Sequence, residues 1–282
     1  MTKYKTINPT TLDEALETLN GCNVMPIAGG TDLLVKFYEV YGKSLPKLVV
    51  LDGLIPLHEI KTENDRISLG PLVTFSEIEN SPELRKAAPQ LVQAASVAGS
   101  VQIRNRATIG GNIANGSPSG DLIPPLYVLN AELELSSVNG RRSIPIDKFF
   151  KGPGITVLEK NELITSISFD KTFENGFFLR LATRKALAIS KVSVAANYSM
   201  QNGTITNVRI ALGAVAPTVI RAPRTEEYLS GKELNDNVLS TAAKLIKEEA
   251  KPISDIRSIA DYRREMVGVL LKRGLNGIPQ SE

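Results

Sequence analysis

The spacing of apolar residues predicts an α/β arrangement for the first fifty-odd residues. Apolar positions recur at helical intervals in some stretches and form short continuous runs of strand length in others. Thr11 followed by Glu14 fits a capping box and sets the start of the first helix. The predicted elements are helices over Leu12–Leu19 and Asp32–Val40, and strands over Val24–Ala28 and Leu48–Leu51.

The pattern of apolar and polar positions from residue 58 to residue 173 predicts both strands and helices. Strands are predicted at Arg66–Gly70, Ala131–Ser136, Arg142–Ile146 and Leu163–Phe169, and helices at Thr74–Ile78 and Pro82–Ala98. The segment Gly99–Leu126 has no clean period and contains five glycines and three prolines. Loops this long in compact domains are usually functional or disordered. Apolar residues such as Ile103 and Ile113 argue against disorder, so an ordered binding loop is expected.

The last third of the chain has a different order of predicted elements, with strands first and helices after them. Successive antiparallel strands are predicted at Phe177–Thr183, Val192–Met200 and Thr204–Val215, followed by helices at Pro223–Leu229, Asn237–Ala250 and Ala260–Gly274. Asn202-Gly203 is the sequence typical of a type I′ hairpin turn. A boundary is therefore expected near Asp170–Gly176, which divides the chain into residues 1–57, 58–173 and 174–282.

Composition excludes several classes of protein. The 282 residues are 42% hydrophobic and 22% charged, with a net charge of +3, which is too weak to indicate nucleic-acid binding. No stretch approaches the ~18 apolar residues of a membrane span. One cysteine and one histidine exclude an internal disulfide and a metal site built from this chain's own cysteines or histidines. We expect a cytoplasmic protein in which a bound organic cofactor carries any catalysis.

Two glycine pairs carry the clearest chemical signal: Ala28-Gly29-Gly30-Thr31-Asp32 and Thr108-Ile109-Gly110-Gly111-Asn112. Backbone without side chains can adopt positive φ and approach a ligand, and its successive N–H groups can form a nest for an anion. Either pair alone is more often a tight turn. Together they favour a ligand with a pyrophosphate, which points to a dinucleotide.

Neither of the common nucleotide signatures fits. Gly42-Lys43-Ser44 resembles the end of a P-loop, but Phe37 stands where that motif needs its first glycine. Gly152-Pro153-Gly154 lacks the third glycine and the preceding strand of a Rossmann fingerprint. The ligand is therefore expected to bind by another scheme.

Other polar residues leave two interpretations open. Arg104 and Arg106 precede the second glycine pair and would either meet phosphates or be solvated at the surface. Asp121 would either bind a ligand hydroxyl or cap the local backbone. His58 is interpreted as a surface or capping histidine and Cys22 as an incidental thiol.

The two glycine motifs, extended through Gln102–Ile113, Ser117-Pro118 and Asp121, resemble the flavin-binding medium subunit of molybdenum hydroxylases. The closing Pro252–Ser258 segment, followed by Tyr262-Arg263, is also similar to that family. The resemblance covers essentially the whole chain. It implies an α+β fold of the p-cresol methylhydroxylase type, in which residues 1–57 and 58–173 form two FAD-binding subdomains. Residues 174–282 would form a C-terminal flavin-subunit domain with a three-stranded antiparallel sheet.

The resemblance also implies roles for particular residues. Ala28, Gly29, Gly30, Thr31 and Asp32, with Thr108, Ile109, Gly110, Gly111 and Asn112, would hold the FAD pyrophosphate. Asp121 would hydrogen-bond the cofactor, and Ile164 would line its pocket. Arg180 replaces the family's usual lysine and is a candidate flavin contact. His58 lies outside both motifs, so FAD is expected to be bound non-covalently.

As a member of this family, the chain would be the electron-transfer subunit of a three-component oxidoreductase. It would act with a small [2Fe-2S] subunit and a large molybdenum-cofactor subunit, as a dimer of heterotrimers. The alternatives are a self-contained flavin oxidase or reductase of the same fold and a non-redox nucleotide-binding scaffold. The scarcity of histidine and cysteine disfavours the first alternative, which needs an acid–base group beside the flavin.

Overall fold

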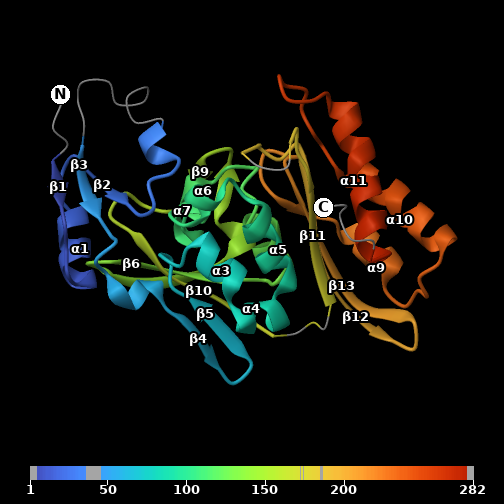
Figure 1. Ribbon diagram of the computed structural model, residues 1–282, viewed down its shortest axis with the longest axis horizontal. Coiled ribbons are helices and arrows are strands. Elements are labelled where there is room, and N and C mark those ends of the chain that lie inside the picture. Colours follow the sequence, from blue (N-terminus) through green and yellow to red (C-terminus); the bar gives the residue numbers. More distant parts are fainter. Residues whose placement is uncertain (1–4, 36–45, 172, 174, 185–186, 278–282) are drawn as a thin grey trace.

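The computed structural model describes residues 5–35, 46–171, 173, 175–184 and 187–277. Its elements form three parts in chain order (Figure 1), with a small parallel sheet and α1 at one end. A five-stranded antiparallel sheet with helices lies in the middle, and a four-stranded sheet backed by α9, α10 and α11 lies at the other end. No helix in these ranges is both long and apolar enough to cross a membrane.

The N-terminal part has the predicted strands and first helix. Its strands run parallel in the order β1-β3-β2, and α1 begins where Thr11 Oγ1 accepts the N–H of Glu14. The elements are β1 (Thr6–Ile7), α1 (Leu12–Leu19), β2 (Val24–Ile27) and β3 (Lys47–Val50). Helical backbone starts again at Leu33, but the predicted helix beyond Val35, with Gly42-Lys43-Ser44, lies outside the described residues.

The middle sheet has the strand order β4-β5-β10-β6-β7 and is antiparallel throughout. Its elements are β4 (Ile60–Glu63), β5 (Arg66–Leu69), α3 (Phe75–Asn80), α4 (Pro82–Ala87), α5 (Pro89–Val97), β6 (Glu132–Ser137), β7 (Gly140–Pro145) and β10 (Leu163–Asp170). Short elements η1 (Ile55–His58), η2 (Ile146–Lys148), β8 (Phe150–Gly152) and β9 (Ile155–Thr156) flank it. The single helix predicted over Pro82–Ala98 is wrong. Pro89 forces Ala88 out of the helical region, to φ −147°, and separates α4 from α5.

The segment Gly99–Leu126 is not an irregular loop. It contains α6 (Val101–Arg104), α7 (Ile109–Asn115) and the start of α8 (Ile123–Val128). Each helix is too short for its apolar period to stand out in the sequence. The second glycine pair lies in the first turn of α7, and the segment's positive-φ glycines are Gly99 and Gly116. Gly110 and Gly111 therefore do not adopt the positive φ that glycine allows.

Both faces of the C-terminal sheet are buried. Along β11, Phe178 joins the core of the middle part, while Phe177 and Leu179 join the core beneath α10 and α11. Figure 1 shows the resulting layers, with β11 lying between α5 and α11. The elements are β11 (Asn175–Leu181), β12 (Val192–Gln201), β13 (Thr204–Gly213), β14 (Ile220–Arg221), α9 (Pro223–Leu229), α10 (Asp236–Glu249) and α11 (Ala260–Leu275). Asn202 and Gly203 have φ of 50° and 79°, which confirms the type I′ turn.

Candidate functional site

A cleft of about 1570 Å³ runs along all three parts of the molecule. This volume exceeds the ~300–1,000 Å³ of ordinary small-molecule pockets, so the cleft has room for a large cofactor. One wall is formed by residues 23–33, and the floor by Gly111, Asn112, Ala114 and Asn115 of α7 with residues 117–121. The opposite wall comes from the C-terminal part, through residues 187–190, Ala214 and Arg263.

The structure brings the two glycine motifs together at Gly29. A Cβ built on Gly29 would lie 1.7 Å from the carbonyl oxygen of Arg106, so only glycine permits this approach of two backbones. Gly30 follows with φ +72°, a conformation that favours glycine. The segment before α7 thus lies against the first turn, and residues of both motifs line one cleft.

The two motifs differ in the backbone donors that they offer. Within the described ranges, the N–H groups of Gly29, Gly30 and Thr31 have no hydrogen-bond acceptor. In the second motif three N–H groups are already bonded: Ile109 to Val73 O at 3.0 Å, Gly110 to Pro71 O at 2.8 Å and Gly111 to Thr108 Oγ1 at 3.1 Å. Among the described residues, the run of three consecutive N–H groups without an acceptor therefore lies in the first motif.

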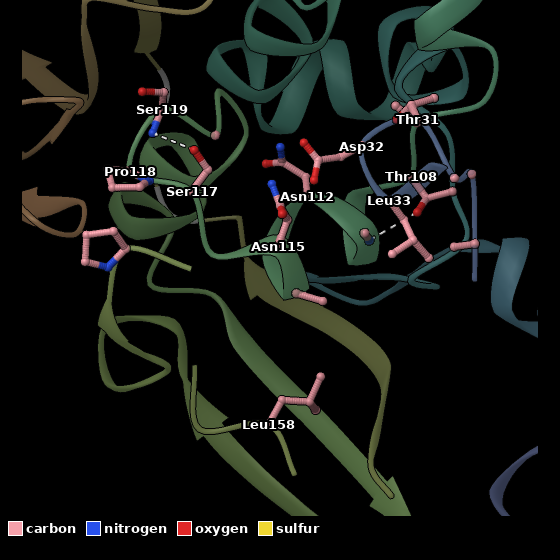
Figure 2. Close-up of a pocket in the computed structure, with 18 of the residues that line it drawn as sticks. Thr31, Asp32, Leu33, Thr108, Asn112, Asn115, Ser117, Pro118, Ser119 and Leu158 are labelled. Carbon is pink, nitrogen blue, oxygen red and sulfur yellow. Dashed lines mark hydrogen bonds between the residues drawn. The ribbon is translucent and has the colours of Figure 1, made fainter. Parts of the chain in front are cut away.

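The second motif contributes its surface and one side chain. Gly110 packs against Pro71, where a Cβ would lie 2.5 Å from the proline Cβ, whereas Gly111 and Asn112 line the cleft. Asn112 Oδ1 is buried and has no partner within the described part of the chain. In Figure 2 the side chains of Asp32 and Asn112 point toward one another from the two motifs. The free N–H groups and this unpartnered oxygen fit a ligand that carries both a pyrophosphate and hydrogen-bond donors.

Asp121 and Arg180 form a buried ion pair at the edge of the cleft. Arg180 Nη1 lies 2.7 Å from Asp121 Oδ2, and Ser190 Oγ donates to Asp121 Oδ1 at 2.6 Å. Arg180 also donates to the carbonyl oxygens of Val97 and Ala188. Burial raises the pKa of Asp121, while Arg180 and Ser190 oppose that rise. This network joins the middle part to the C-terminal sheet. Asp121, Ala188 and Ser190 line the cleft, whereas Arg180 and Val97 do not.

Several predicted residues lie away from the cleft. Ile164 is buried in the core of the middle part, where it pairs with Leu135 across β10 and β6. Arg104 bonds Glu79 at 2.8 Å and Arg106 lies 3.7 Å from Asp52, so both have local carboxylate partners. The His58 ring nitrogen Nε2 lies 3.1 Å from the carbonyl oxygen of Asp52, and His58 does not line the cleft.

The C-terminal wall was not expected from the sequence to border the site. Asp255, Arg257 and Arg263 line the cleft, and Arg263 bonds Asp255 at 2.5 Å and Ala214 O at 3.2 Å. Burial alone would raise the pKa of Asp255, but the Arg257 and Ser258 N–H groups and the Arg263 guanidinium lower it to about 2. The sequence signal in this region was the similarity of the Pro252–Ser258 segment to the family, which did not indicate that the segment borders the cofactor.

Metal chemistry has no support in the described ranges, where no group of three or more His, Cys, Asp or Glu side chains is arranged to hold a metal. The fold is α+β, and the cleft is large enough for a dinucleotide. Comparisons with known proteins give the family.

A family model described as the FAD binding domain in molybdopterin dehydrogenase matches residues 2–170. A second model, the CO dehydrogenase flavoprotein C-terminal domain, matches residues 177–278. The chain belongs to this family: it is an FAD-binding oxidoreductase subunit of the molybdenum hydroxylase type. FAD is thus the dinucleotide, and the predicted α+β FAD-binding fold is confirmed.

The relatives match the chain along nearly its whole length. The glyceraldehyde dehydrogenase medium chain of Sulfolobus acidocaldarius is 31% identical over 277 residues, covering 98% of each chain. The nicotine 6-hydroxylase medium subunit of Paenarthrobacter nicotinovorans is 32% identical, covering 94% of each. Among solved structures, a carbon monoxide dehydrogenase from Hydrogenophaga pseudoflava that lacks the Mo-pyranopterin moiety of its cofactor gives a TM-score of 0.91 at 30% identity. That match covers 97% of this chain and 96% of the other.

Proposed function

We propose that this chain is the electron-transfer subunit of a three-component molybdenum hydroxylase. The bound FAD would supply the chemistry that takes single electrons from [2Fe-2S] clusters of a small partner and delivers electron pairs to an external acceptor. The observation that carries the proposal is the cleft itself, which both motifs line and in which the N–H groups of Gly29, Gly30 and Thr31 have no acceptor among the described residues. The chain's own residues bind and orient the cofactor.

Each motif has a distinct part in this proposal. The N–H groups of Gly29, Gly30 and Thr31 hold the pyrophosphate, since they are donors without acceptors in the described structure. Thr108, Ile109, Gly110 and Gly111 fix the floor against Pro71 and Val73, and Asn112 Oδ1 accepts a hydrogen bond from the cofactor. Asp32 and Asp121 border the same space.

The C-terminal part acts on the cofactor site indirectly, through the buried ion pair that Arg180 forms with Asp121. Arg180 orients Asp121 from behind the cleft wall and has no direct role at the flavin in this proposal. Ile164 supports the cleft indirectly, from the core of the middle sheet. His58 is not among the residues that line the cleft, which supports non-covalent FAD. The division at residues 57 and 173 is retained, and the ends of the two family models near residues 170 and 177 support its second boundary.

The partners are proposed from the relatives. Several are named as medium chains or subunits, and one solved relative is a Cu,Mo-CO dehydrogenase. We propose a small [2Fe-2S] subunit, a large molybdenum-cofactor subunit and a dimer of such heterotrimers. The single cysteine fits a reducing compartment, which supports a cytoplasmic location.

Co-purification from the native host tests this function. Partners that carry [2Fe-2S] clusters and molybdenum, with flavin reduced only in their presence, would support it. A yellow protein that is isolated alone and turns over a substrate without partners would establish the self-contained flavoenzyme instead. A protein that stays colourless and binds no FAD would leave only the nucleotide-binding scaffold.

A further inference from the structure

A second cavity, of about 460 Å³, lies at the far end of the middle sheet from the FAD cleft. Glu162, just before β10, lines the cleft, and Asp170, the last residue of β10, lines this cavity. A strand of eight residues at ~3.4 Å per residue places the two sites about 25 Å apart. The cavity lies where the middle part meets β13 and β14, and its lining includes Tyr127, Asn130, Arg209 and Arg221.

Arg209 makes no ion pair within 4.0 Å among the described residues, although the Glu226 carboxylate acts on its charge from farther away. Its Nη1 lies 3.4 Å from Val128 O, and its guanidinium carbon lies 4.8 Å above the centre of the Phe173 ring. Within the described ranges no carboxylate lies within 4.0 Å of it. Burial and the neighbouring Arg221 lower its pKa, yet an arginine remains charged at neutral pH. A half-buried charge without a partner is costly unless something compensates it.

Arg221 is held in place next to it. Its Nε and Nη2 bond the two carboxylate oxygens of Glu226 at 2.7 and 2.9 Å, and its Nη1 donates to Asn130 Oδ1 at 3.1 Å. That bond occupies the amide oxygen of Asn130 and leaves the amide nitrogen without an acceptor in the described part of the chain. This wall of the cavity therefore offers donors held in place by packing and hydrogen bonds.

Tyr127 gives a second and independent indication. Its side chain lines the cavity and is only 5% exposed, yet its hydroxyl has no hydrogen-bond partner among the described residues. The hydroxyl oxygen itself is not fully buried, so it can be reached from the cavity. A tyrosine hydroxyl that is open to the cavity and has no protein partner in the described structure is available to hydrogen-bond a ligand.

The acidic residues of the lining already have cations. Arg66 bonds Glu132 at 2.7 Å and Asp170 at 3.1 Å, and Asp147 lies 3.5 Å from Lys148. The three arginines and three carboxylates of the lining balance, and the arginine among them that has no carboxylate within 4.0 Å in the described structure is Arg209. We propose that this cavity binds a small oxyanion, a phosphate or carboxylate group, between Arg209, Tyr127 and the Asn130 amide. The site lies outside the FAD cleft and does not depend on electron transfer.

The full chain loaded with FAD tests the site, because FAD then fills the other place where an anion would bind. Inorganic phosphate and acetate are titrated in separate arms at constant ionic strength, by calorimetry and thermal unfolding. At an anion concentration about fivefold above Kd, mass action predicts a rise in Tm of about 2–4 °C. The tighter of the two anions identifies the ligand group.

Three variants assign the effect. R209Q is expected to weaken binding by at least about tenfold, since charge-assisted hydrogen bonds are the strong ones. Y127F keeps the buried ring and is expected to weaken binding by about threefold or more, which tests the site even if R209Q does not fold. R224Q removes an equal charge from the exposed Arg224–Glu248 pair and should titrate like the wild type. Identical titrations of wild type, R209Q and Y127F, or no saturation up to about 50 mM anion, would overturn the proposal.

Discussion

The close approach of the two glycine motifs makes a sharp prediction for Gly29→Ala. The added Cβ would lie 1.7 Å from the carbonyl oxygen of Arg106 and 2.6 Å from its carbonyl carbon. Ordinary van der Waals contact of a Cβ begins at 3.4 Å, so the Cβ and the carbonyl oxygen must separate by about 1.7 Å. Neither side can relieve the clash by rotating a side chain, because the obstacle is main chain on both sides.

The cost has two components. Overpacking of a fitted contact costs about 1–3 kcal/mol, and a backbone obstacle places this one at the upper end. Moving the first motif also withdraws its N–H groups from the cofactor, and each charge-assisted hydrogen bond is worth about 1.5–3 kcal/mol. Loss of two such bonds weakens FAD binding by at least about 100-fold.

A flavin fluorescence titration and a thermal melt of the cofactor-free protein measure the two components separately. Gly152→Ala is the matched control, because its Cβ would meet nothing closer than 3.9 Å and its φ is not positive. We expect Gly152→Ala to bind FAD like the wild type. If Gly29→Ala retained its FAD affinity within about threefold and its melting temperature within about 2 °C, the reasoning about the two motifs would be refuted.

Three further substitutions test the rest of the site. Arg180→Met leaves Asp121 buried without its cation and should lower the free energy of unfolding by about 3–5 kcal/mol, measured by urea unfolding. The double variant Arg180→Met with Asp121→Leu should recover part of that loss. Asn112→Ala removes an oxygen that has no partner, so the melting temperature of the cofactor-free protein should stay within about 2 °C while FAD affinity falls by about tenfold in a titration. For Asp255 the folded-state pKa of about 2 lies below the unfolded value, so its stabilisation is present above pH ~4 and is lost as pH falls toward 2. Unfolding of Asp255→Asn followed across that range should show a smaller loss than the wild type, and equal losses would contradict the assignment.

The sequence predicted most of the long elements and the family, because these rest on local signals. Thr11 with Glu14 and Asn202 with Gly203 fix a helix start and a turn through hydrogen bonds and φ values that neighbouring residues determine. The break at Ala88 was also a local signal, since a proline disfavours helical backbone in the residue before it, but it was outweighed by the apolar period across Pro82–Ala98.

The partners of the charged residues at the site could not be predicted in the same way. Arg180 meets Asp121 across 59 positions of the chain, and Arg263 meets Ala214 O across 49. Nothing in the spacing of residues encodes such contacts, because they depend on how the C-terminal sheet packs against the middle part. The position of Ile164 could not be predicted for the same reason. Its side chain lies in the core because of the register in which β10 pairs with β6, where Ile164 is opposite Leu135.

The two glycine pairs look equivalent in the sequence and are physically different in the structure. Gly29 and Gly30 lack side chains so that backbone can approach backbone and leave N–H groups free. Gly110 lacks one because the first turn of α7 packs on Pro71, and its N–H is bonded to Pro71 O. Substitution of Gly110 should therefore act first on folding, whereas loss of donors in the first motif acts first on FAD. Two Gly-Gly pairs in one sequence can thus serve two functions. They are distinguished by whether their N–H groups have a hydrogen-bond acceptor within the described protein.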